Sequence, residues 1–248
     1  MIYLIVFALG TIIGSFLNVC IYRIPRGQSV VFPPSRCIPC GTRLKFKDMI
    51  PVISYITLKG RCRYCGEHIN IIYPVVEVAA GLIYLFTFIN LGYTYLTVKY
   101  MILFSGLIVV FFTDLNDGVI PDVVLLFIFT AGFILSCIFR ENLLGNLVGS
   151  LLGCGALFLI AVIAPGTMGM GDVKLMAACG WYLGGSRTLL SLFLSFVIGG
   201  AAGLILVTTR RRKMKDMISF GPFLAFGTFI SAVYGYGIID FYLSMFKP

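Results

Sequence analysis

Eight apolar stretches constrain this chain more than any other feature. A helix that crosses a bilayer needs about 20 apolar residues. The stretches are 1–22, 74–92, 97–113, 120–139, 144–164, 172–186, 188–209 and 218–245. Of the 248 residues, 59% are hydrophobic and only 12% are charged, about half the charged share of a soluble domain. We therefore predict an all-α, polytopic membrane helix bundle of about eight transmembrane helices, with the lipid bilayer as its main surroundings.

The basic residues indicate which helix ends face the cytoplasm, because Lys and Arg concentrate in cytoplasmic loops. Most of the 19 basic residues lie in two segments, 23–73 and 210–217. Both segments fall on one side only if the stretch 172–186 spans the membrane, although it is short. This topology places the N-terminus outside and explains the net charge of +9 without a nucleic-acid partner. Residues 1–22 lack the basic start and cleavage site of a signal peptide, so we expect them to remain as the first helix.

The segment 23–73 is the one sizeable loop in this topology, and it contains two C-x2-C pairs. Cys37 and Cys40 are followed, after 21 intervening residues, by Cys62 and Cys65. Four thiolates at such spacing are typical of a tetrahedral Zn²⁺ site. A loop of about 50 residues is too short to be held by a hydrophobic core alone, so a metal is a reasonable staple. Two alternatives are redox-active thiols and structural disulfides, and a reducing cytoplasm disfavours the disulfides.

Two aspartates stand out because ionisable side chains at a membrane boundary are costly and usually functional. Asp114 ends the third stretch, and Asp172 begins the sixth as the last residue of the tetrapeptide Gly-Met-Gly-Asp. The topology puts both at the cytoplasmic boundary, where they can face each other. Neighbouring carboxyl groups share a proton, so one can activate a water while the other protonates the departing group. Alternatively Asp172 is only a helix N-cap, and we expect Asp117 and Asp122 to solvate a loop or cap the fourth helix.

Several groups of residues occur in the order typical of one known family. They are Gly14-Ser15-Phe16-Leu17-Asn18-Val19, the two C-x2-C pairs, Leu58 to Cys62, Tyr73 to Glu77, Asp114 to Asp122, Gly169 to Leu175, and Phe220-Gly221-Pro222-Phe223. In these groups, which cover nearly the whole chain, the sequence resembles the type IV prepilin peptidases, also called leader peptidase/N-methyltransferases. The resemblance implies an aspartic membrane peptidase of the GxGD type, with Asp114 and Asp172 as its catalytic pair.

The resemblance also implies a substrate and a second activity. The enzyme would lie in the cell membrane of a prokaryote and remove the short basic leader of type IV prepilins or pseudopilins, just after a glycine, on the cytoplasmic side. Many members then methylate the new N-terminal amine with S-adenosylmethionine, an activity linked to the region that corresponds to residues 23–77. Gly60 matches a glycine tied to methylation. We add Glu77, whose carboxylate could bind the substrate amine or the methyl donor, or simply favour the start of a helix.

These expectations divide the chain into a first transmembrane helix (1–22), a cytoplasmic four-cysteine zinc domain linked to methylation (23–73) and a seven-helix transmembrane peptidase domain (74–248). Three alternatives remain. A preflagellin-type peptidase would cleave without methylating, and the cysteine loop argues against it. A transporter would use Asp114 and Asp172 as a proton or ion relay, but such sites usually lie near the midplane of the bilayer. A zinc-stapled membrane scaffold would carry out no chemistry.

Overall fold

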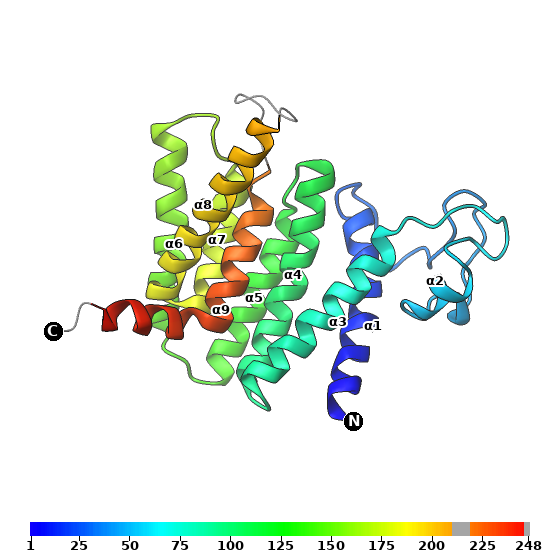
Figure 1. Ribbon diagram of the computed structural model, residues 1–248, viewed down its shortest axis with the longest axis horizontal. Helices are drawn as coiled ribbons and strands as arrows, with labels where there is room; N and C mark the ends of the chain where they lie inside the picture. Colours follow the sequence, from blue (N-terminus) through cyan, green and yellow to red (C-terminus); the bar gives the residue numbers. More distant parts are fainter. Residues whose placement is uncertain (210–218, 246–248) are drawn as a thin grey trace. The chain divides into compact units, whose positions relative to one another are not determined.

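The computed structural model describes residues 1–209 and 219–245, which form helices joined by loops (Figure 1). This described part contains no β-strand, only two isolated bridges in the loop after the first helix. The helices are α1 (Ile2–Arg23), η1 (Phe46–Asp48), α2 (Ile53–Thr57), α3 (Ile72–Leu91), α4 (Tyr95–Asp117), α5 (Asp122–Ile138), α6 (Leu143–Ile163), α7 (Met170–Leu183), α8 (Gly185–Thr208) and α9 (Gly221–Ser244). The all-α prediction is therefore confirmed.

Each of the eight apolar stretches corresponds to one α-helix among the described residues, and several of these helices are long and apolar, so the chain is a multi-pass membrane protein. Six of these helices are long and apolar enough to cross a bilayer by length and composition: α1, α3, α4, α6, α8 and α9. α5 is apolar but has 17 residues, and α7 has only 14. That α5 and α7 also cross the membrane stays a prediction. The basic segment 210–217, on which the predicted topology partly depends, lies outside the described residues.

The chain divides into two compact units, Met1–Thr97 and Val98–Pro248. In the first unit α1 packs along α3, and glycines allow the close approach. A Cβ atom on Gly14 would lie 2.7 Å from the Cα atom of Glu77, closer than any side chain permits. Membrane helices associate through such small residues because lipid offers them no hydrophobic driving force.

α7 is the centre of the second unit, because it packs against α5, α6, α8 and α9. Most of its 14 residues are buried, from Asp172 to Leu183. Gly149 of α6 and Gly180 of α7 meet so closely that a Cβ atom on Gly149 would overlap the carbonyl oxygen of Gly180. A short helix with an aspartate in its first turn is therefore surrounded by protein rather than lipid, which is where membrane proteins keep ionisable side chains.

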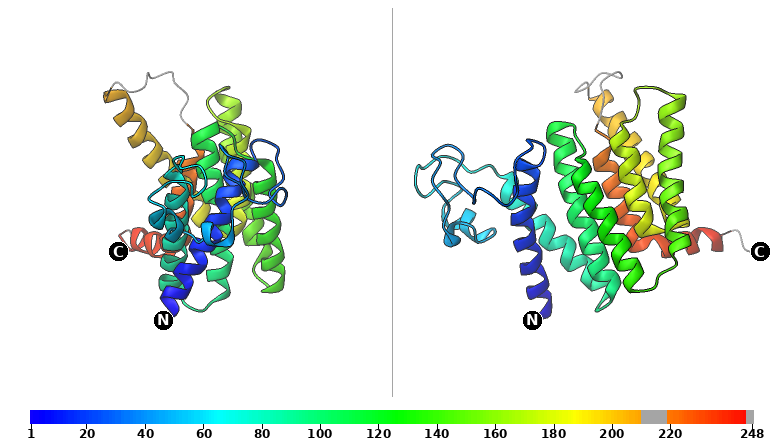
Figure 2. Two further views of the ribbon diagram at one scale, coloured as in Figure 1. Left: turned by 90° about the vertical axis from the view of Figure 1, so that its right-hand side faces the viewer. Right: turned by 180° about the vertical axis from the view of Figure 1, so that it is seen from behind.

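The helices of the second unit run alternately in opposite directions, as both figures show (Figures 1 and 2). The end of α4 therefore lies at the same end of this unit as the starts of α5, α7 and α9. Contacts agree with the pictures, since Ser219, just before α9, donates a hydrogen bond of 3.0 Å to the carbonyl oxygen of Asp114 in α4. Both predicted catalytic aspartates belong to this end of the unit.

Candidate active site and metal centre

Asp114 lies in the last turn of α4 and is only 6% exposed. Its Oδ2 atom accepts a hydrogen bond of 2.9 Å from the backbone N–H of Gly221, which is 107 positions further along the chain. A Cβ atom on Gly221 would lie 2.6 Å from that same oxygen. The hydrogen bond therefore depends on glycine at the first position of α9, and it fixes the direction of the carboxylate.

Asp172 lies in the first turn of α7 and is 7% exposed. The N-cap residue of this helix is Gly169, so the alternative that Asp172 itself is the N-cap is wrong. Its Oδ2 atom accepts a hydrogen bond of 3.3 Å from the N–H of Gly169. Its Oδ1 atom is buried and has no hydrogen-bond partner among the described residues. Native proteins rarely leave such an atom unpaired, so Oδ1 marks a place for a proton, a water or a ligand.

The two carboxyl groups lie close enough for the charge of Asp114 to act on Asp172. Both are buried, so little solvent screens their repulsion. In this situation it is costly for both carboxyl groups to ionise. The pair therefore holds one proton between its two members. The arrangement can therefore present one carboxylate and one carboxylic acid to the same bound molecule.

The other two aspartates of this region are exposed. Asp122 does not cap α5, whose N-cap is Pro121. Its carboxylate instead accepts hydrogen bonds of 2.8 and 2.9 Å from Nζ of Lys174, which links the start of α5 to α7. Asp117 is the last residue of α4. The structure thus separates these two solvent-facing aspartates from the buried pair.

The four cysteines of the loop converge on one point, as the spacing predicts. The Sγ atoms of Cys37, Cys40, Cys62 and Cys65 all lie within 4.8 Å of one another, and those of Cys37 and Cys65 are 3.8 Å apart. Sulfur atoms at the corners of a tetrahedron around Zn²⁺, with Zn–S bonds of about 2.3 Å, are about 3.8 Å apart. The donor set therefore fits a zinc ion. A site of four thiols fits the redox and disulfide alternatives less well, since each of those needs only a pair.

Each C-x2-C pair forms a tight turn closed by backbone hydrogen bonds. The N–H of Gly41 donates to the carbonyl oxygen of Cys37, and that of Gly66 donates to Cys62, each at 2.9 Å. Both glycines have positive φ angles, +70° and +74°. Such angles strain any residue with a side chain, which explains why glycine follows the second cysteine of each pair.

The thiols of the cluster differ in acidity. A hydrogen bond with the Thr42 hydroxyl lowers the pKa of Cys40 to about 6. Burial, together with the neighbouring sulfurs, raises the pKa of Cys37 to about 12. A bound dication would remove this difference, because every coordinating thiol loses its proton.

The two residues predicted to take part in methylation lie in the first unit. Gly60 has a φ of +68°, and a Cβ atom there would lie 3.0 Å from the hydroxyl oxygen of Tyr55. Glu77 is 8% exposed, and its Oε2 atom accepts a hydrogen bond of 2.7 Å from the N–H of Val52. Val52 is the N-cap residue of α2 and has a φ of +63°, which is unfavourable for a β-branched residue. The carboxylate of Glu77 therefore holds the backbone immediately before α2.

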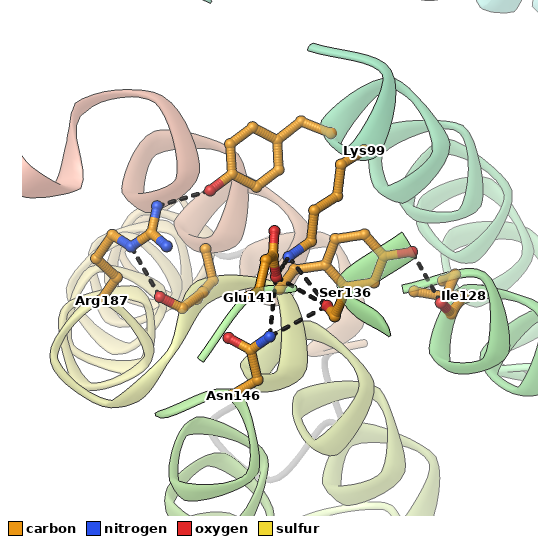
Figure 3. A network of polar contacts seen from close by, with 9 residues as sticks. Lys99, Ile128, Ser136, Glu141, Asn146 and Arg187 are labelled. Carbon is orange, nitrogen blue, oxygen red and sulfur yellow. Dashed lines mark hydrogen bonds and ion pairs between the residues drawn. The ribbon is translucent and has the colours of Figure 1, made fainter. Parts of the chain in front are cut away.

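A buried charge network at the other end of the second unit escaped prediction from the sequence (Figure 3). The ammonium of Lys99, a residue only 2% exposed, binds Oε2 of Glu141. Ser136 and Asn146 donate to the same oxygen at 2.8 and 3.0 Å. In the predicted topology Lys99 is only one of the few basic residues that lie outside the cytoplasmic segments. The signal available was its place inside an apolar stretch, where a lysine needs a partner.

Fold and site together define a polytopic membrane protein with two buried carboxyl groups at one end of its second unit and, in its first loop, a cluster of four thiols that could hold a metal ion. A relative from Bacillus subtilis (strain 168), called prepilin leader peptidase/N-methyltransferase, is 32% identical over 244 residues, 97% of this chain and 98% of the relative. The chain belongs to the type IV leader peptidase family.

Further comparisons agree with this membership. The profile of the type IV leader peptidase family matches residues 101–204, and that of the bacterial peptidase A24 N-terminal domain matches residues 8–91. A Pseudomonas aeruginosa relative of the same name is 29% identical, with 95% of this chain and 91% of the relative covered. One from Myxococcus xanthus is 34% identical, with 83% of this chain and 63% of the relative covered. No solved structure matches the chain significantly.

Proposed function

We propose that this protein removes the leader peptide of prepilins or pseudopilins and methylates the new N-terminal amine. The observation that carries the proposal is the pair of buried aspartates, one of which has an oxygen without a partner among the described residues. Relatives that match nearly the whole chain bear the name prepilin leader peptidase/N-methyltransferase. The buried pair also disfavours a membrane scaffold without catalysis, which would have no use for such a costly arrangement.

In the proposed hydrolysis Asp114 is the base and Asp172 is the acid. The N–H of Gly221 stabilises a carboxylate at Asp114, so this residue takes a proton from the attacking water. The oxygen of that water bonds to the carbonyl carbon of the scissile peptide. Asp172 holds the proton on its unpaired Oδ1 and gives it up as the peptide bond breaks, so that the leaving nitrogen departs as an amine. The proton that Asp114 took restores the shared state.

For methylation we propose that residues 23–77 act on the amine that cleavage exposes. S-adenosylmethionine supplies the methyl group when it is bound, and the chain has to hold an uncharged amine in line with it. Gly60 is tied to this activity by the family resemblance, and its backbone conformation admits no larger residue easily. Because Glu77 is buried and already bonded to Val52, its geometry supports a role in positioning α2 better than direct binding of the methyl donor.

We further propose that zinc is bound by Cys37, Cys40, Cys62 and Cys65 and that it staples this loop. The N-terminus would lie outside the cell, and the cysteine loop and the aspartate pair would face the cytoplasm. Peptidase chemistry belongs, in this proposal, to the seven helices of residues 74–248. The positive-inside rule and the nine basic residues of segment 23–73 support this orientation.

The deciding experiment is to incubate the purified protein with a prepilin and to weigh the product by mass spectrometry. We expect a chain shortened by the leader, and a further methyl mass only when S-adenosylmethionine is present. Asp114→Asn and Asp172→Asn variants should insert normally and leave the prepilin uncut, because an amide cannot hold or accept the proton. Normal processing by either variant would rule out the assigned pair.

A further inference from the structure

The cysteine loop carries an exposed apolar ridge, which we define as Phe46, Met49, Ile50, Ile53 and Ile56. Their exposed fractions are 84%, 38%, 36%, 58% and 67%. Their spacing places them in pairs on one side of a short helix. Phe46 and Met49 are three residues apart along a 3₁₀ turn, and Ile53 and Ile56 are three residues apart on α2. Five large apolar side chains within 11 residues are more than a small soluble loop usually leaves in water.

The hydrogen bond between Glu77 and Val52 fixes the position of this ridge along the axis of α3. Glu77 lies five residues after the start of α3, which is long and apolar enough to span the membrane, so its backbone lies about 7 Å along the helix from that start. Val52 is held directly against this carboxylate, and the ridge residue Ile53 follows it in the chain. The views from opposite sides draw α2 at a height between the two ends of α1, rather than beyond them (Figures 1 and 2).

Positive charge borders the ridge. Lys45, Lys47 and Lys59 are exposed, and among the described residues they form no ion pair. The acidic residue within the ridge, Asp48, is neutralised by Arg63 at 2.7 Å. Uncompensated lysines beside large apolar side chains suit the boundary between anionic headgroups and acyl chains.

We propose that the apolar ridge inserts into the headgroup region of the bilayer leaflet on the side where α1 ends and α3 begins. The three lysines then contact the headgroups of anionic lipids. The hydrogen bond from Val52 to Glu77 holds the ridge at this depth. The cysteine loop is then a monotopic element fastened flat on the membrane rather than a domain free in solution. This inference does not depend on the proposed peptidase or methyltransferase activity.

The test uses the full-length protein in vesicles, with single tryptophans as depth probes. Trp181→Phe removes the one native tryptophan, whose buried indole N–H has no partner among the described residues. In that background, Ile56→Trp and Phe46→Trp each place a probe on the ridge. Ile38→Trp is the matched control, because Ile38 is 61% exposed in the first cysteine pair but lies outside the ridge. Emission is compared in vesicles with bromine near the glycerol end of the acyl chains and in vesicles without bromine.

Brominated lipid should quench the two ridge probes strongly and the control probe weakly. Quenching at the ridge should be greater in anionic than in zwitterionic vesicles, and Lys45→Gln with Lys47→Gln should remove that difference. Unquenched ridge probes, or equal quenching of ridge and control, would overturn the proposal. Ridge probes that respond only when a prepilin is added would also overturn it, because the occupant would then be a polypeptide.

Discussion

At the scale of single residues, one glycine decides the direction of the carboxylate of Asp114, which we propose to be catalytic. Gly221 gives its N–H to Oδ2 of Asp114 and has no room for a side chain against that oxygen. The contact explains why a glycine stands in the Phe-Gly-Pro-Phe group at the start of α9. A substitution of Gly221 therefore tests the orientation of the Asp114 carboxylate, whereas a substitution of Asp114 tests only its presence.

Gly221→Ala should reduce leader cleavage on the order of 100-fold, because a displacement of about 1 Å at a reacting group has an effect of that size. The Cβ atom would lie 2.6 Å from Oδ2 of Asp114, so the carboxylate has to move. The rate of cleavage by purified protein measures the effect. Gly237→Ala is the matched control in the same helix, since nothing lies within 4 Å of a Cβ atom there. Equal rates for the two variants would contradict the role given to Gly221.

At the scale of elements, we expect the cysteine loop, but not the helices, to depend on a bound metal ion. We expect about one zinc per chain in the purified protein, measured by elemental analysis. Cys62→Ser should abolish this zinc, whereas Cys137→Ser, at an exposed cysteine outside the cluster, should leave it unchanged. Protein that contains no zinc, with disulfides between the paired cysteines in fresh lysate, would instead support the redox alternative.

The charge network links α4, α5 and α6 at the end of the unit opposite to the aspartates, and its contribution is measurable as a pair. Lys99→Met alone leaves the carboxylate of Glu141 without its cation, which should lower the free energy of unfolding by roughly 3–5 kcal/mol. Adding Glu141→Gln should recover part of this loss, because no unpaired charge then remains. Unfolding by denaturant in mixed micelles gives both values. If the double variant is less stable than Lys99→Met, the two residues do not act as an ion pair.

At the scale of the whole molecule, the residues proposed for the two activities lie in different compact units: Gly60 and Glu77 in Met1–Thr97, and Asp114 and Asp172 in Val98–Pro248. The matches to the two family profiles fall one in each unit. A substitution in one unit should therefore abolish one activity without abolishing the other. Methylation still depends on cleavage in one respect, because an uncut prepilin offers no new amine.

Gly60→Val should therefore spare cleavage and lose methylation, because valine is strained at a φ of +68° and meets the Tyr55 hydroxyl. Asp172→Asn should do the reverse when it is given precleaved pilin, methylating it at the normal rate. Product masses with both substrates separate these outcomes. An Asp172→Asn protein that is folded but leaves precleaved pilin unmethylated would show that the activities are not independent.

The sequence by itself determined the all-helical membrane architecture, the four-thiol centre and the two aspartates. Each of these depends on a local pattern: an apolar run of fixed length, a cysteine spacing, or a charge at the edge of an apolar run. Such patterns express how single helices and turns satisfy their own backbone and side chains, so they can be read without knowing what lies beside them.

Only the tertiary structure decided which side chains meet. Nothing local pairs Asp114 with Gly221, Lys99 with Glu141 or Glu77 with Val52, because each contact joins distant positions in the chain. It also showed that α7, short and polar at its start, is buried by its neighbours. A buried polar group has to find a partner in the protein, and which partner is within reach depends on how the helices pack.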